Sequence, residues 1–128
     1  MPGNKGPAAG LNSGTLNGGK VHFAVVKWDG AVDGVASTGD VINLFDLPAG
    51  AKLLPSMSSV IGNQATTTAT IKAAAVSVQS GIACTGAVDL DSADIAVVNA
   101  ETTISATLAA GGIAADKAVT FFIAYLAV

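Results

Sequence analysis

The sequence predicts a single all-β domain of about eight strands, arranged as a sandwich or a barrel. Short segments alternate apolar and polar residues, as strands with one buried face do. Glycine, proline and aspartate separate these segments at intervals of roughly 8 to 12 residues, and helix signals are poor. The 128 residues leave room for one domain and no second core.

The composition is unusually poor in charge for a soluble domain. Charged residues make up 12% of the chain, about half of the roughly 25% expected, whereas hydrophobic types reach 51%. Two explanations stay open. The apolar excess is mostly alanine and valine, so it forms small surface that water tolerates, or part of it is buried against another chain.

Residues 1–19 predict a flexible N-terminal arm, and residues 20–128 predict the ordered domain. The arm carries six glycines and two prolines among Asn and Ser, so it cannot bury enough apolar surface to offset the entropy cost of ordering. Such an arm is either an end without a role or a segment that becomes ordered across a neighbouring subunit or partner.

The first strand is expected at residues 21–28, VHFAVVKW. Alternation places two sets of side chains on opposite faces. One set is Val21, Phe23 and Val25, and the other is His22, Ala24, Val26 and Trp28. Three Asp-Gly or Thr-Gly turn signals follow within residues 29–39, which predicts a loop or short ribbon.

Residues 40–45 are almost wholly apolar, and this predicts a strand covered on both faces. Leu47-Pro48-Ala49-Gly50 then interrupts it, because proline removes a ladder donor and glycine tolerates positive φ. The chain therefore turns a sheet corner and enters another strand at about residues 57–61.

Three later segments also predict strands. TTTATIKA (66–73) and TTISATLA (102–109) alternate as half-buried strands do, whereas AVTFFIAYLAV (118–128) is apolar on both faces. A closing strand of this kind lies in mid-sheet between two layers or presents one face to another protein. Helical turns are expected at most at 73–75 and 91–96, the latter with Asp91 as N-cap.

Residue types that carry chemistry are scarce. All six basic residues are lysine and the net charge is −3, which argues against nucleic-acid binding. His22 is the only histidine and is interpreted as structural, and Cys84 is interpreted as a small buried thiol. We therefore expect no enzyme, no catalytic residue, no cofactor and no metal site.

Asp89, Asp91 and Asp94 form a D-x-D-x-x-D pattern whose oxygens suit Ca²⁺. The pattern lacks the glycine and the distant glutamate of an EF-hand loop, and short connections carry aspartate for turns and caps. We interpret these aspartates as turn residues rather than as a calcium site.

Neither a secretory signal nor a membrane span is recognisable. Residues 1–10 contain no apolar h-region. The longest apolar run, residues 118–128, is shorter than the about 20 residues that a spanning helix needs. We expect a soluble product made in the cytoplasm, without a membrane partner.

Several segments occur in a distinctive order: GDVINLFDLPAGAKLL (39–54), the threonine-rich strand (66–73), VDLDSAD (88–94), TTISATLAAGG (102–112) and the closing apolar strand (119–128). In this order the chain resembles the capsid cement, or head decoration, proteins of tailed bacteriophages. The resemblance covers residues 20–128, and its most distinctive part is the L-P-A-G-A corner.

This resemblance implies a β-sandwich of jelly-roll type. It also implies a homotrimer on the outside of the capsid, where the protein stabilises contacts between major capsid subunits without catalysis. The protein would then be made in the host cytoplasm and reside on the virion surface. A shell clamp needs many modest contacts, which ordinary apolar area with a polar rim supplies.

The alternative is a tail, fibre or head-surface β-domain that binds a host glycan or another virion protein, and an enzyme is the third hypothesis. For the leading hypothesis, the residues expected to contact other subunits or the capsid are Leu47 and Pro48 at the corner, and Phe121, Phe122, Tyr125 and Leu126 on the closing strand.

Overall fold

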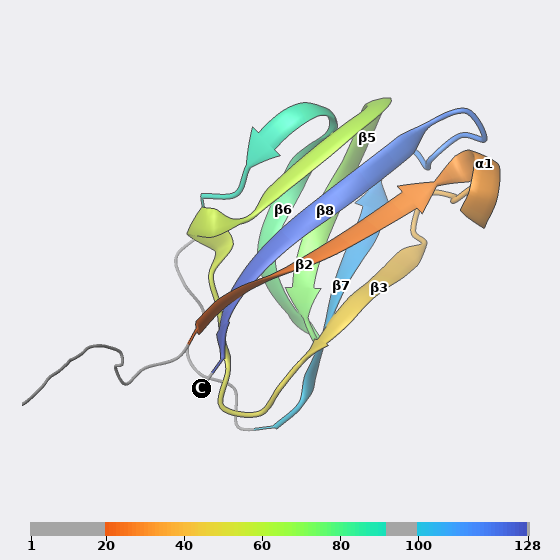
Figure 1. Cartoon of the computed structure of the whole chain (residues 1–128). Coiled ribbons are helices and arrows are strands. Elements are labelled where there is room, and N and C mark those ends of the chain that lie inside the picture. The colour runs from red at the N-terminus through yellow and green to blue at the C-terminus, as the bar shows by residue number, and fades with distance from the viewer. Residues whose placement is uncertain (1–19, 92–99, 128) are drawn as a thin grey trace, which may run out of the picture.

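A computed structural model describes residues 20–91 and 100–127, which form one antiparallel sheet that curls on itself (Figure 1). Its seven strands are β2 (Lys20–Asp29), β3 (Val41–Leu47), β4 (Lys52–Leu53), β5 (Ser59–Ala73), β6 (Val76–Asp89), β7 (Thr102–Ala109) and β8 (Ala118–Ala127). The prediction of an all-β domain is confirmed. The predicted arm at 1–19 and all but the first residue of the predicted turn at 91–96 lie outside the described residues.

Two short helical turns accompany the strands. The helix α1 (Gly30–Asp33) follows β2, and a 3-10 turn (Pro55–Met57) precedes β5. Pro55 is the first residue of that 3-10 turn, a position whose N–H makes no hydrogen bond within the turn, so the missing N–H of proline costs nothing there. In the part of the chain that the structure describes, no helix is long and apolar enough to cross a membrane.

The strands follow the order β2-β8-β5-β7-β3, with β4 paired to β8 and β6 paired to β5. The curl brings β2 and β3, the two ends of this order, to the same side of the molecule, where they contact each other (Figure 1). The sequence predicted about eight strands in a sandwich or barrel. The described residues instead contain seven strands, and hydrogen bonds join them all in one curled sheet.

The curl depends on β5, which changes its partner halfway along its length. Its first half, residues 59–62, pairs with β8, and its second half, residues 68–73, pairs with β7. Both halves also pair with β6, and the register of that pairing shifts between Asn63 and Thr68. Thr66 adopts a φ of 68° within this interval, so the strand bends there.

Polar side chains at the bend replace the missing ladder hydrogen bonds. The side-chain oxygens of Asn63 and Gln64 accept hydrogen bonds from the backbone amides of Ala118 and Ala114, at 2.9 and 3.0 Å. The buried hydroxyl of Thr67 donates to a carbonyl of the same β7–β8 connection at 2.7 Å. The bend therefore leaves these backbone groups with hydrogen-bond partners.

The core lies inside the curl, on the inward faces of β3, β5, β6, β7 and β8. The predicted alternation is confirmed for residues 66–73, where one face is buried and the other is more exposed. In residues 102–109 it holds except at Ser105, which lies on the polar face and is nevertheless buried. Fully buried core side chains include Leu47, Val60, Ala69, Ile71, Ile82, Ile104, Ala106, Leu108, Val119, Phe121 and Ile123.

The prediction that β3 is covered on both faces is wrong. Ile42 and Leu44 are buried, but Val41 is 57% exposed and Asn43 is exposed. The reason is that Val41 and Asn43 lie on the outer face of the curled sheet and meet solvent, whereas Ile42 and Leu44 face the core. β3 also lies at the end of the strand order, where it pairs with β7. A nearly continuous apolar run therefore forms an edge strand here.

The sheet corner predicted after β3 is confirmed. The backbone N–H of Ala51 donates to the carbonyl of Pro48 at 3.1 Å, and Gly50 has a φ of 85° that suits glycine. The reversed chain enters β4, where Lys52 and Leu53 pair with β8. The corner thus connects an edge strand with the middle of the sheet.

Phe121→Ala tests the assignment of the inward face of β8. The wild-type ring is fully buried, so its removal leaves a cavity and should lower the free energy of unfolding by about 3–5 kcal/mol. The matched control is Val76→Ala, because Val76 is 66% exposed and its loss should change stability by less than about 0.5 kcal/mol. Urea unfolding measures both, and equal midpoints would contradict the assignment.

Candidate interaction surface

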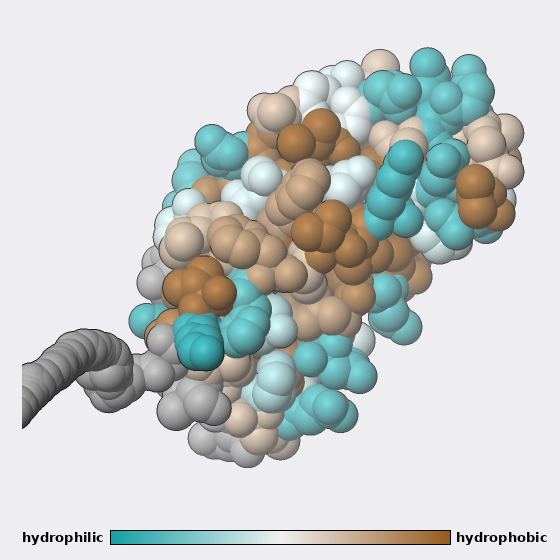
Figure 2. All heavy atoms as spheres, viewed as in Figure 1, coloured by the Kyte–Doolittle hydropathy of each residue, from teal (hydrophilic) through white to brown (hydrophobic). Residues whose placement is uncertain are grey.

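The outward side of β2 exposes large apolar side chains. Val21, Phe23 and Val25 are 45%, 55% and 59% exposed, and Ala24 and Val26 next to them on the strand are less exposed. Figure 2 shows hydrophobic residues gathered across the middle of this side, with hydrophilic residues toward both ends. Soluble monomers rarely leave contiguous apolar surface of this kind uncovered.

The strand register extends this region from β2 across β8 to β5. Residues directly opposite each other in an antiparallel pair lie on the same face of the sheet. Val21 lies opposite Leu126, Val25 lies opposite Phe122, and Thr120 lies between Lys27 and Ile61. The apolar sheet face, as we name it, consists of Val21, Phe23, Val25, Ile61, Phe122 and Leu126.

Polar and charged residues surround the apolar sheet face. Lys27 lies on the margin that β2 forms, and its side chain is 58% exposed. Asp89 lies on the opposite margin, on β6, because it pairs with Ser59, which in turn pairs with Phe122. Lys52 lies beside Leu126 at one end. An apolar centre with a polar rim is the usual composition of a protein interface.

Two of the residues predicted to contact other subunits belong to this face, and a third is exposed elsewhere. Phe122 and Leu126 are partly exposed members of the apolar sheet face, and Pro48 is exposed at the corner after β3. These three side chains are accessible to a second chain.

Leu47 and Phe121, also predicted as contact residues, are fully buried in the core. Both lie on the inward face of their strands, so their side chains are not part of the surface, and this corrects their assignment. Tyr125 also points inward and is partly buried. Its ring stacks on His22 and on Phe45, with centroids 5.3 and 5.2 Å apart.

This aromatic row connects β2, β8 and β3, so it joins the two ends of the curled sheet. Stacked rings at these distances contribute about 0.5–1.5 kcal/mol beyond the area that they bury. The geometry agrees with the interpretation of His22 as a structural residue.

Sequence reasoning did not select Val21, Phe23, Val25 or Ile61 as contact residues. The alternation of β2 was recognised, but both of its faces carry apolar side chains. Nothing local in the sequence distinguishes the face that meets the core from the face that meets solvent. Pairing with β8 makes that distinction.

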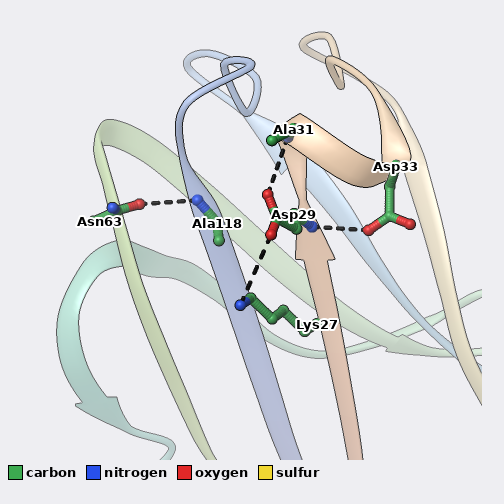
Figure 3. Close-up of polar contacts among 6 residues, drawn as sticks. All are labelled: Lys27, Asp29, Ala31, Asp33, Asn63 and Ala118. Atoms are coloured by element: carbon green, nitrogen blue, oxygen red, sulfur yellow. Dashed lines mark hydrogen bonds and ion pairs between the residues drawn. The ribbon is translucent and has the colours of Figure 1, made fainter.

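A second exposed apolar region lies at one end of the sheet, in α1 and the residues after it. Val32 is 81% exposed and Val35 is 64% exposed. Hydrogen bonds hold this loop in place, as Figure 3 shows: Asp29 caps α1 by accepting from the N–H of Ala31 at 3.0 Å, and its own N–H donates to Asp33 at 2.8 Å. We name the segment 29–36 the loop end.

The loop end also docks on the connection between β7 and β8. The N–H of Gly30 donates to the carbonyl of Lys117 in that connection at 2.8 Å. The indole N–H of Trp28 on β2 donates to the carbonyl of Gly34 at 2.9 Å and so holds the loop end against its own strand. Gly30 lies so close to Ala114 that an added Cβ would be 1.9 Å from its carbonyl oxygen. Glycine is therefore required at this contact.

Lys27 and Asp29 form an ion pair beside the loop end, with 3.9 Å between Nζ and Oδ2 (Figure 3). Both side chains are accessible to water, so the pair contributes at most about 1 kcal/mol. The hydrogen bonds of the Asp29 side chain and backbone are the stronger constraint on the loop.

Cys84 is buried, as the sequence predicted. Burial removes the thiolate from water and raises the pKa of the Cys84 thiol from 9.0 to about 11. The thiol is therefore protonated at neutral pH, and a protonated, buried thiol is a poor nucleophile.

In residues 20–91 and 100–127, no three His, Cys, Asp or Glu side chains gather where they could hold a metal ion, and no pocket is found. Asp94, one of the three aspartates of the D-x-D-x-x-D pattern, lies outside these residues. The backbone N–H of Asp91 donates to the side chain of Gln79 at 2.9 Å.

No protein-family model and no curated protein sequence matches this chain. The fold is similar to that of a chain in the acidic stable capsid structure of Helicobacter pylori bacteriophage KHP30. The TM-score is 0.60, the sequence identity is 12%, and the match covers 87% of this chain and 90% of that chain. At this identity the likeness concerns the fold.

Cys84 should react slowly with thiol reagents in the native protein. At pH 8 we expect alkylation at least about tenfold slower than in urea, because the folded thiol is buried and its pKa is about 11. The folded state resists ionisation of this group, so the stability of the protein should fall as the pH rises from 9.0 towards 11. Equal rates with and without urea would contradict the burial of Cys84.

Asp29→Ala should destabilise the protein by about 1 kcal/mol, because it removes the oxygen that caps α1. Asp29→Asn is the matched control: it retains a side-chain oxygen at the same position and should lose less than half as much. Urea unfolding of both variants measures the difference. A loss as large for asparagine as for alanine would assign the effect to the charge of Asp29 rather than to the cap.

Proposed function

We propose that this chain is a structural protein of a bacteriophage virion, without enzymatic activity. It binds the outside of the capsid and stabilises contacts between major capsid subunits. The observation that carries the proposal is the fold likeness to a chain of a phage capsid structure, which extends over 87% of this chain and 90% of the other. The resemblance of residues 20–128 to cement proteins points independently to the same role.

In this proposal the major capsid protein is the partner and the virion surface is the location of the protein. The jelly-roll topology and the homotrimer that the resemblance implies stay predictions. Several copies that bind together would make modest single contacts sufficient, because attachment through linked sites multiplies their effect.

The loop end is suited to contact the capsid. Val32 and Val35 are the most exposed valines at this end of the sheet, and their backbone is already held by the hydrogen bonds of Asp29, Asp33 and Trp28. A contact loop that is ordered before binding loses little conformational entropy when it binds. Two small apolar side chains on such a loop fit a shallow apolar depression in a partner.

Co-sedimentation with mature capsid shells that lack the protein tests the proposal. We expect the wild-type chain to pellet with the shells, and Val32→Asp with Val35→Asp to bind at least about tenfold more weakly, because the contact would bury a charge. Val76→Asp is the control, since Val76 is about as exposed as Val35 but lies on β6.

Wild-type protein that stays in the supernatant would contradict the proposed function and favour a tail, fibre or other surface domain. Binding that is unchanged in the Val32 and Val35 double variant would reject the loop end as the contact while leaving capsid binding in place.

A further inference from the structure

We propose that the apolar sheet face is a self-association surface, covered in solution by neighbouring copies of this chain. The inference does not depend on the proposed function, because it concerns contact between copies and not contact with a capsid. It names the surface, the residues that form it and the partner.

The first argument is the extent of apolar surface. Val21, Phe23, Val25 and Ile61 are each between 45% and 59% exposed, and Phe122 and Leu126 lie beside them on β8. A single exposed apolar residue needs no explanation, but a contiguous group that includes a half-exposed phenylalanine indicates an interaction site.

The second argument is the size of the face. From Val21 to Lys27 the strand rises about 20 Å, and four neighbouring strands span about 14 Å between their outer axes. With its side chains included, the face covers a flat area on the order of 400 Å². Its solvent-accessible area is larger, because the side chains make the surface uneven. A stable interface buries about 800 Å² per partner, so this face with its polar rim is of the required order.

The third argument is the shape and availability of the partner. An open sheet face is covered most completely by another sheet, because two sheets pack face to face about 10 Å apart and interdigitate their side chains. A second copy of this chain carries such a face and is present as soon as the protein is made. A capsid or another protein would leave the face uncovered until the two meet.

The fourth argument is the distribution of charge on the margins. Lys27 lies on the β2 margin and Asp89 lies on the β6 margin of the same face. Suppose that a rotation axis parallel to the strands relates the copies and that each apolar sheet face points toward this axis. The β2 margin of one copy then lies next to the β6 margin of its neighbour, for a dimer as for a trimer. Opposite charges then lie next to each other across each contact, which favours this arrangement.

Size-exclusion chromatography with light scattering on the full chain tests the proposal at micromolar concentration. We expect the wild-type mass to be an integer multiple of 12.4 kDa. Phe23→Asp should shift the mass to that of the monomer, because it places a charge in the centre of the contact. The Val32 and Val35 double variant is the control, since it leaves the apolar sheet face intact and should keep the wild-type mass.

A charge exchange sharpens the test. Lys27→Asp and Asp89→Lys should each raise the dissociation constant several-fold, because each places like charges on adjoining margins. The two changes together restore opposite charges and should recover most of the wild-type association. If Lys27 and Asp89 only stabilised the fold of their own chain, the combined variant would not regain the wild-type dissociation constant.

A wild-type chain that stays monomeric, or Phe23→Asp protein that keeps the wild-type mass, would overturn the proposal. If Phe23→Asp fails to fold, as judged by circular dichroism and urea unfolding, Val25→Asp replaces it, because Val25 is 59% exposed and unfolding is not expected there. A monomer that binds shells would overturn this inference and leave the proposed function standing. An oligomer that does not bind shells would support this inference and contradict the proposed function.

Discussion

The bend of β5 is the constraint on which the rest of this structure depends. A strand has two edges, and β6 occupies one of them along both halves of β5. The other edge therefore serves β8 before the bend and β7 after it. This exchange of partners turns a flat ladder into a curled sheet, brings β2 and β3 to the same side, and encloses the core (Figure 1).

The residues at the bend extend its effect to the loop end. Asn63, Gln64 and Thr67 hydrogen-bond to the backbone of the connection between β7 and β8. That connection in turn bonds to Gly30 and pairs with Ala36. These polar contacts start in the middle of the longest strand and, together with the hydrogen bonds of Asp29, Asp33 and Trp28, fix the position of the exposed valines.

The two exposed apolar regions lie on different elements, and this separation has a functional consequence. The apolar sheet face belongs to β2, β8 and β5, whereas the loop end follows β2 at one end of the sheet. Val32 and Val35 can be replaced without altering the residues of the apolar sheet face, so self-association and attachment to a larger assembly need not compete for the same surface. A protein that binds in several copies benefits from this arrangement, because every copy keeps its loop end available.

The sequence by itself determined the all-β class, the alternating burial of the threonine-rich strands and the corner at Leu47–Gly50, because each of these depends on local alternation or local turn chemistry. It did not determine which side of an apolar strand is buried. β2 and β8 are apolar on both faces, and Phe121 enters the core while its neighbour Phe122 points outward only because of the register with β2 and β5. β3 becomes an edge strand for the same kind of reason, since its partners come from distant parts of the chain. Tertiary pairing therefore decided which side chains form the candidate surface, because burial depends on what lies across each strand and periodicity describes only the strand itself.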